Sequence, residues 1–520
     1  MHVRWNDIDE RNSASKSRKR TIKFEGKSEE KSNRRRDELA AQKNLCHAIF
    51  PIYYLGKVCG LIPVKFVVQA DGKYQTHLTV LNLIYSLCVL VLLLGSEIWG
   101  LWRDLKDGWK HSTRLKSRTA VIATCSDVLG VMSLTVVCIG GSFFRWKYLQ
   151  VVANKLIEVD EKFGVHSMKN SRMFTICITV CSLAYLWLNS GLDFYAWTRK
   201  TNLTKTMDDK GPINYAPLYF MYTVIISTEL QYTVATYNVS QRFVKLNNSL
   251  KSLLNGSNPS PSDCLKGSPA KTVMTGDLRE KGLNHDIVPC RQFELSAQHI
   301  LWNPKGTTQR IHSNENENSS RFYKVRVSST FTGSETHANS IHELIMTHSS
   351  LCDTVSLINN TFGIVILAVT TSCLLHLVIT PYFLILQAGE GHEWIFLAVQ
   401  GMWCIFHVTR MLIIVQPSYS TVAEGKRTAV LVSQLLSSSY EANARHQLEI
   451  FSLQLLHRPL EFSVCGLFSL DRTLITSIAG AVTTYLVILI QFQNADETKG
   501  TADIIKNATQ ILESAHRFRT

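Results

Sequence analysis

The sequence lacks the residue patterns on which enzymes depend. No nucleophile is paired with a base, no glycine-rich loop could hold a phosphate, and no cluster of metal ligands stands out along the 520 residues. We therefore expect a protein that is not an enzyme. It should have no catalytic residue, no metal, no cofactor and no nucleic-acid partner.

Patterns for disulfide bonds and zinc sites are also missing, although the chain has 13 cysteines. Most of them lie inside long apolar runs or in segments expected to face the cytoplasm, where thiols stay reduced. None falls in a loop expected outside the cell. Cys177 and Cys181 share one apolar run, which favours packing over zinc binding.

What the sequence does have is long apolar runs. A helix needs about 20 predominantly apolar residues to cross a bilayer, and seven runs are long enough: Leu78 to Leu101, Thr119 to Phe144, Met173 to Asp193, Ile213 to Val239, Ser356 to Gln387, Glu393 to Gln416 and Leu474 to Gln493. The fourth run is the weakest, because it is rich in Tyr and carries Glu229. A buried helix of a large soluble protein is the alternative for each run, but their number favours an all-α membrane protein with seven transmembrane helices.

A basic arm precedes the first run and indicates the orientation. It holds Arg18, Lys19 and Arg20, and then Arg34 to Arg36. The first run begins too late for a cleavable signal peptide, and positively charged flanks stay on the cytoplasmic side. We therefore expect a cytoplasmic N-terminus, and the odd number of runs then gives an extracellular C-terminus.

The runs and the composition between them define a domain plan. Polar or amphipathic segments are a basic cytoplasmic extension (1–51), a cytoplasmic helix extension (240–255), a disordered cytoplasmic insert (256–340), a cytoplasmic anchor-helix region (417–473) and an extracellular tail (494–520). Membrane segments are helices 1 to 4 (52–239), helices 5 and 6 with a cytoplasmic extension (341–416) and helix 7 (474–493). Apolar residues at helical spacing, such as Phe243, Leu246 and Leu250, continue the fourth helix beyond the membrane.

Four strings of residues resemble the insect gustatory receptor family, and within it the fructose-sensing branch. They are C-L-L-H-L-V-I-T-P-Y-F (Cys373 to Phe383), Q-G-M-W-C-I-F-H-V-T-R (Gln400 to Arg410), F-S-V-C-G-L-F-S-L-D-R-T-L-I (Phe462 to Ile475) and T-Y-L-V-I-L-I-Q-F (Thr484 to Phe492). The resemblance implies an insect chemoreceptor ion-channel fold and a ligand-gated, non-selective cation channel of four subunits that meet at a cytoplasmic anchor domain.

Polar side chains inside the apolar runs are candidates for ligand binding, because such groups are costly in hydrocarbon unless they face a cavity or a partner. The residues expected at one depth in the outer half of the membrane, or as aromatic surface near it, are Asp127, Asn189, Asp193, Tyr195, Trp197, His376, Thr380, Tyr382, Gln400 and Trp403. Donors and acceptors beside flat aromatic surfaces suit a small polyol. Each of these groups alone is more often an interhelical hydrogen bond. The resemblance around His376, Gln400 and Trp403 implies that the ligand is fructose or a related sugar.

The last apolar run is the candidate for the pore. Ser477, Ala481, Thr484, Ile488 and Gln491 follow each other at helical spacing and form a mixed small, polar and aliphatic face. The resemblance implies that this helix lines the ion pathway, with Gln491 and Phe492 near the extracellular constriction. Helix packing is an equal alternative for Thr484 and Tyr485. Arg410, near the end of the sixth run, is expected to snorkel or to pair rather than to gate.

Two other classes have seven or more spans. A G-protein-coupled receptor is disfavoured because the chain has no D-R-Y string after the third run and no N-P-x-x-Y string in the last. A sugar transporter is disfavoured because the chain has no two similar halves. We expect the plasma membrane of chemosensory neurons as location, with sugar, membrane lipid and permeant cations as partners and either a homotetramer or a heteromer with other gustatory receptors.

Overall fold

The computed structural model describes most of the residues from 45 to 492. The described residues are 45, 48–68, 74–107, 118–163, 169–204, 212–257, 331–389, 394–439, 441–492 and 509. The chain separates into two units, Met1–Ser257 with Ser334–Thr520, and Asn258–Gly333. The basic N-terminal arm, most of the 256–340 insert and nearly all of the C-terminal tail lie outside the described residues.

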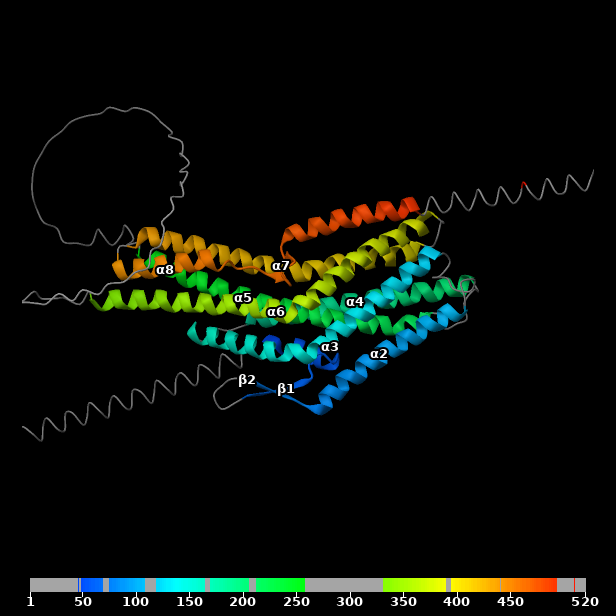
Figure 1. Cartoon of the computed structure of the whole chain (residues 1–520), viewed down its shortest axis with the longest axis horizontal. Coiled ribbons are helices and arrows are strands. Elements are labelled where there is room, and N and C mark those ends of the chain that lie inside the picture. The colour runs from blue at the N-terminus through cyan, green and yellow to red at the C-terminus, as the bar shows by residue number, and fades with distance from the viewer. Residues whose placement is uncertain are drawn as a thin grey trace, which may run out of the picture. The chain divides into compact units, whose positions relative to one another are not determined.

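Long helices make up the first unit (Figure 1). After a helical segment at residues 48–58, a hairpin of β1 (Val64–Val68) and β2 (Tyr74–Leu78) pairs Val64 with Leu78 in antiparallel register. The long helices are α2 (Val80–Asp107), α3 (Arg118–Lys162), α4 (Lys169–Thr204), α5 (Ala216–Ser257), α6 (Phe331–Gly389) and α7 (Trp394–Ser438). The short 3-10 helix η1 (Pro212–Tyr215) precedes α5, and α8 (Ala442–His457) follows α7. A small hairpin of β3 (Ser463–Val464) and β4 (Phe468–Ser469) leads to a last helix, Arg472–Phe492.

Six of the described helices are long and apolar enough to cross a membrane: Val80–Arg103, Thr124–Lys162, Asn170–Arg199, Ala338–Ile385, Trp394–Ser438 and Arg472–Phe492. The fourth expected span, on α5, is not among them. Its position explains this difference, because α5 packs against α2, α3, α4 and α7 and is the most enclosed of the helices. A helix that is surrounded by other helices has little contact with lipid, so its surface can be less apolar than that of a helix that faces lipid.

The seam between α5 and α7 is an extensive helix contact of this unit. A proline in α7 shows how closely the two helices fit. Pro417 has no N–H to donate to the carbonyl of Ile413 one turn earlier, and the Thr233 hydroxyl of α5 donates to that oxygen at 2.9 Å. At the adjacent positions of the two helices, the hydroxyls of Tyr232 and Ser418 lie 2.7 Å apart. The α7 carbonyl that proline leaves without a donor thus receives a hydrogen bond from a side chain of α5.

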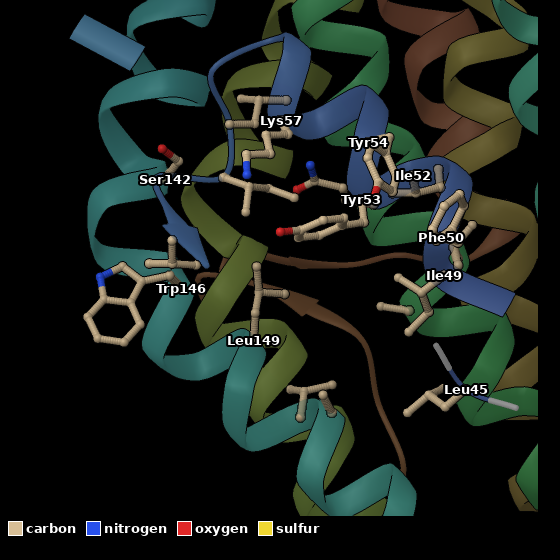
Figure 2. A pocket seen from close by; sticks show the side chains of 18 of the residues that line it. Leu45, Ile49, Phe50, Ile52, Tyr53, Tyr54, Lys57, Ser142, Trp146 and Leu149 are labelled. Carbon is tan, nitrogen blue, oxygen red and sulfur yellow. The ribbon is translucent and has the colours of Figure 1, made fainter. Parts of the chain in front are cut away.

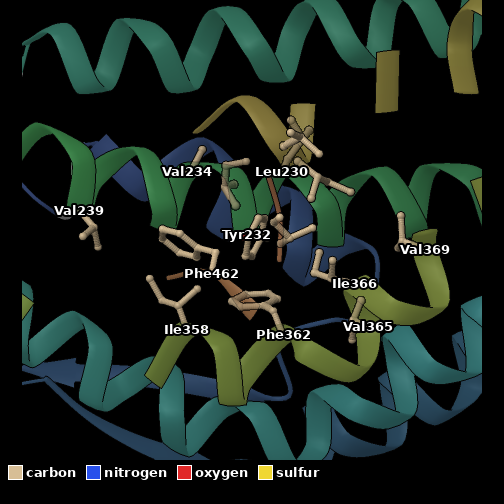
Figure 3. Packing of buried hydrophobic residues seen from close by; sticks show 14 of the residues in the cluster. Leu230, Tyr232, Val234, Val239, Ile358, Phe362, Val365, Ile366, Val369 and Phe462 are labelled. Carbon is tan, nitrogen blue, oxygen red and sulfur yellow. The ribbon is translucent and has the colours of Figure 1, made fainter. Parts of the chain in front are cut away.

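The apolar core continues from this seam to α6. The ring of Tyr232 lies with its centroid 5.6 Å from Phe362 of α6 and 6.4 Å from Phe462, which precedes β3 (Figure 3). Phe362 and Phe462 are both buried. The segment after α8 is therefore part of the core and fixes where the last helix begins.

The last helix, drawn in orange to red in Figure 1, lies along the edge of the unit. Asp471 caps its N-terminus, accepting hydrogen bonds from the backbone N–H groups of Thr473 at 2.9 Å and Leu474 at 3.3 Å. The hydrogen bond from the Thr473 side chain lowers the pKa of Asp471, which keeps the cap ionised. One stripe, which includes Leu474, Ile475 and Ile478, packs against the core. The opposite face is exposed, and Ile478 is the one buried residue of this helix.

Two boundaries and one segment of the sequence-based domain plan differ from the secondary structure. The helix α6 begins at Phe331 and so includes the end of the stretch expected to be a disordered insert, because a helix that is anchored by the packed stripe from Ile341 propagates backward at little cost. The boundary at residue 417 falls inside α7, which continues through Pro417 to Ser438. The β1–β2 hairpin lies in the segment assigned to membrane helices, and its short strands carry too weak a periodicity to be distinguished from a loop.

The hydrogen bond that compensates for Pro417 gives a first test. In Thr233→Val the carbonyl of Ile413 loses its donor, and we expect a loss of about 1 kcal/mol in unfolding free energy, the scale of interhelical hydrogen bonds in membranes. Chemical denaturation of the detergent-purified protein measures it. The matched control is Thr371→Val, which removes an exposed hydroxyl bonded within its own helix. Equal stability of the two variants would contradict the assignment.

Candidate functional site

Aromatic and histidine side chains of α5, α6 and α7 form a buried cluster. Trp403 of α7 stacks on Tyr219 with ring centroids 6.5 Å apart and lies 5.2 Å from Tyr222, both on α5. His376 of α6 lies 4.4 Å from His407 of α7 and 6.0 Å from Tyr222. Trp403 is 8% exposed and His376 2% exposed. His376 and Trp403, which were expected at one depth in the membrane, are thus connected through the rings of Tyr222 and His407.

A carboxylate of α3 reaches the same cluster. The Nε2 atom of His376 lies 2.7 Å from Oδ1 of Asp127, and the Nδ1 atom of His376 lies 2.5 Å from the backbone oxygen of Ser372. The imidazole of His376 thus lies between a carboxylate of α3 and a backbone carbonyl of its own helix. Because the Asp127 side chain is 29% exposed, its second oxygen can accept a hydrogen bond from a ligand.

A second carboxylate meets the cluster from α4. The hydroxyl of Tyr219 donates to Oδ2 of Asp193 at 2.6 Å, and the Tyr219 ring stacks on Trp403. Asn189 lies one turn before Asp193 on α4 and is buried. Four helices, α3, α4, α6 and α7, therefore contribute residues expected from the sequence, and α5 connects them.

A buried ion pair lies directly next to these rings. Arg410 of α7 donates to Oε1 of Glu229 of α5 from Nε at 3.0 Å and from Nη2 at 2.6 Å, and the two residues are 1% and 0% exposed. The guanidinium lies 5.9 Å from the Tyr222 ring centroid and its Nη1 atom 3.3 Å from Nδ1 of His407. Arg410 was expected either to snorkel or to pair, and in the structure it pairs with Glu229.

The other expected residues lie on α4, α6 and α7, the helices that carry Asp193, His376 and Trp403. Trp197 of α4 packs edge-on against Phe396 of α7, with centroids 5.0 Å apart. Thr380 and Tyr382 are buried on α6, and Gln400 is half-buried on α7, one turn before Trp403. The structure thus links Asp127, Asp193, His376 and Trp403 and adds three residues that were not expected to bind ligand, Tyr219, Tyr222 and His407. The signal for the two tyrosines was the Tyr-rich character of the fourth run.

The expected pore residues all lie on the exposed face of the last helix. Thr484 and Gln491 are exposed, Ile488 is 39% exposed and Phe492 is 65% exposed. Arg472, at the start of the helix, lies 4.0 Å from the Tyr419 ring centroid of α7, and its Nη2 atom lies 3.3 Å from Oε1 of Gln416. The last helix is therefore attached to α7 at its first turn, while its polar face is free to meet water, lipid or another chain.

Comparisons of the sequence and of the fold with known proteins all find chemosensory receptors. The 7tm chemosensory receptor family matches residues 49–285 and 307–496. The gustatory receptor for sugar taste 43a of Drosophila melanogaster is 27% identical over 453 residues, which cover 86% of this chain and 98% of that receptor. The putative gustatory receptor 28a of the same organism is 29% identical over 251 residues, which cover 47% of this chain and 54% of that receptor.

A solved structure with a similar fold is the insect olfactory receptor OR5 from Machilis hrabei. It aligns with a TM-score of 0.53 at 14% identity, covering 87% of this chain and 99% of that one. The complex of that receptor with eugenol aligns with a TM-score of 0.52 at 13% identity. At such identity the likeness concerns the fold, and it supports a multi-pass membrane protein with an insect chemoreceptor architecture.

The buried ion pair gives the second prediction. Arg410→Leu leaves the Glu229 carboxylate buried without its partner, and we expect a loss of roughly 3–5 kcal/mol in unfolding free energy. The double variant Glu229→Leu/Arg410→Leu should recover most of it, because no buried charge remains. The unfolding temperatures of the single and the double variant, measured by thermal unfolding with size-exclusion chromatography, give the comparison. A double variant no more stable than Arg410→Leu would contradict the pairing.

Proposed function

Since this chain belongs to the 7tm chemosensory receptor family, we propose that it is a gustatory receptor that acts as a sugar-gated, non-selective cation channel of four subunits. Fructose or a related sugar is the proposed ligand. It would bind in the outer half of the membrane among Asp127, Asp193, His376 and Trp403, together with the other expected residues around them. The last helix of each subunit would line the pore.

The observation that carries this proposal is the aromatic and polar cluster around Trp403. A sugar offers hydroxyl groups on its rim and C–H groups on its faces, so its site needs flat aromatic surface beside carboxylate, imidazole or amide groups. Trp403, Tyr219 and Tyr222 supply the surface, while Asp127 and Asp193 supply acceptors. The likeness to a sugar taste receptor over nearly its whole length supports the same ligand class.

The exposed last helix supports the pore. A helix in lipid normally presents apolar side chains to it, yet the exposed face here includes Ser477, Thr484 and Gln491. Four copies around an axis would place these groups on a water-filled path and Ile488 at an apolar ring, which can gate by excluding water. In this arrangement the polar side chains of the exposed face would contact water instead of lipid. A single chain does not form such a water-filled path.

The helix α7 provides a physical connection between the two sites. Trp403 lies in its first half, and Gln416 and Tyr419 contact Arg472 of the last helix several turns later. A sugar that binds one position of α7 more tightly than another shifts the equilibrium toward that position. The contact with Arg472 would then move the first turn of the pore helix.

Electrical recording tests the ligand and pore assignments together. In excised patches without added nucleotide, we expect fructose to evoke cation current. Trp403→Ala should raise the half-activating sugar concentration at least tenfold with unchanged conductance, whereas Gln491→Ala should alter conductance or resting leak. Trp394→Ala, which removes a 76% exposed tryptophan of the same helix, is the matched control and should behave like the original protein.

The alternatives predict different results. A G-protein-coupled receptor would need cytosolic components and would expose an epitope tag at Met1 on intact cells. A sugar transporter would accumulate labelled fructose without large currents. Either result, or exchanged effects of Trp403→Ala and Gln491→Ala, would overturn the proposal.

The contact between Arg472 and Tyr419 gives a separate prediction about coupling. A cation–π contact at a partly exposed site contributes about 0.5–1 kcal/mol, so Tyr419→Leu should shift the half-activating sugar concentration roughly two- to fivefold. Binding of labelled sugar to the closed channel should stay the same. Tyr148→Leu removes an exposed tyrosine of α3 and serves as control. Equal shifts in both variants would contradict coupling through this contact.

A further inference from the structure

A cavity of about 510 Å³ lies away from the aromatic cluster. Its walls are the helical segment at residues 48–58, the beginning of β1, and parts of α3 and α5 (Figure 2). In Figure 2, Tyr53 extends from the helical segment toward α3, where Trp146 and Leu149 form the opposite wall. The volume falls within the range of roughly 300–1,000 Å³ that is typical of small-molecule sites.

The cavity has two chemical regions. Most of its lining is aliphatic or aromatic, with Ile49, Ile52, Leu149 and Val152 among the residues. Lys57 and Lys65 also line it, one on each side of the turn from the helical segment into β1. Among the described residues, neither lysine has a carboxylate partner. The cavity thus offers a large apolar volume with two cationic groups at one edge.

A buried amide in the wall has an unused donor. Gln231 of α5 is 9% exposed, and its Nε2 atom has no hydrogen-bond partner among the described residues. Gly56 lies against it, and a Cβ atom at that position would come within 2.6 Å of Nε2. The absence of a side chain at Gly56 therefore makes room for the amide. Because an unpaired buried donor is costly, this group points to an acceptor supplied by a ligand.

The position of the cavity along the chain relates it to the membrane boundary. The β1–β2 hairpin leads directly into the span Val80–Arg103, and Lys65 pairs with His77, three residues before that span begins. On the other wall, the lining residues of α3 other than Ser142 belong to the second half of the span Thr124–Lys162. Cationic groups at the end of a span and apolar side chains beside it match the order of headgroup and acyl chain in a phospholipid.

We propose that this cavity binds an anionic phospholipid of the membrane. The acyl chain fills the apolar part, the phosphate and its charged headgroup lie against Lys57 and Lys65, and an ester carbonyl accepts the hydrogen bond from Gln231. A sugar would leave its hydroxyl groups facing mostly apolar walls, and a sterol would leave two lysines without a counter-charge. The bound lipid joins the helical segment at residues 48–58 to α3 and α5.

Photo-crosslinking on the full-length protein in nanodiscs tests the site. The probe is phosphatidylserine with a diazirine in its acyl chain, in a phosphatidylcholine bilayer, and labelled peptides are mapped by mass spectrometry. We expect labels on peptides that contain residues 45–65 and 142–156. Ala153→Trp, which fills the cavity from α3, should reduce this labelling at least fivefold.

The two lysines provide the decisive variant, because Lys57 is only half-buried and Lys65 is exposed, so the fold does not depend on them. Lys57→Ala/Lys65→Ala should lower labelling by phosphatidylserine at least fivefold and leave labelling by a phosphatidylcholine probe unchanged. Lys162→Ala/Lys251→Ala removes the same charge at positions that do not line the cavity and should have no effect.

Several outcomes would overturn the proposal. These are equal labelling by both phospholipids in the original protein, labelling that both variants leave intact, and labelling by a sterol probe alone. Displacement by glycerophosphoserine, which has the headgroup without acyl chains, would indicate a soluble phosphate ligand instead of a lipid. The assay measures lipid contact and no current, so its result stands apart from that of the sugar-gating experiments.

Discussion

The structure depends on the need to satisfy polar groups inside a helical bundle whose interior is mostly apolar. The helix α5 carries Glu229 and Thr233 in its most enclosed part, and α7 carries Arg410 and Pro417 opposite them. These groups pair across the seam: the Glu229 carboxylate with the Arg410 guanidinium, and the Thr233 hydroxyl with the carbonyl that Pro417 leaves without a donor. Such contacts have strict geometry, so they fix the rotation and the height of α5 against α7. Apolar packing alone would tolerate a slide by one turn.

This constraint explains which parts of the fold could be predicted from the sequence. Helices that face lipid must be apolar, so the runs that become α2 and the last helix stand out from hydropathy alone. The run on α5 is the weakest, because a helix enclosed by protein can exchange apolar residues for Glu229, Thr233 and the tyrosines. The β1–β2 and β3–β4 hairpins could not be predicted, since strands of two to five residues have no reliable periodic signal.

The candidate site could be predicted to a similar extent. Equal depth on separate runs was sufficient to group Asp127, His376 and Trp403, because antiparallel helices place residues of one depth side by side. Depth says nothing about rotation, however, so it could not show which of the grouped side chains contact one another. His407 shares the face of α7 that carries Trp403, whereas Tyr222 of α5 could be found only once the partner of each helix was known.

The same seam limits how the protein can move. Glu229 with Arg410 and Thr233 with the Ile413 carbonyl hold α5 and α7 together over more than one turn, and breaking either contact exposes a buried polar group to an apolar surrounding. A low-energy motion must therefore keep this pair intact. It can shift α3 and α6 at the Asp127–His376 contact, where the carboxylate is partly exposed. It can also bend α7 near Pro417, where a backbone hydrogen bond is already missing. Both places adjoin a proposed function: the first lies at the ligand cluster, and the second lies next to the residues of α7 that contact the last helix.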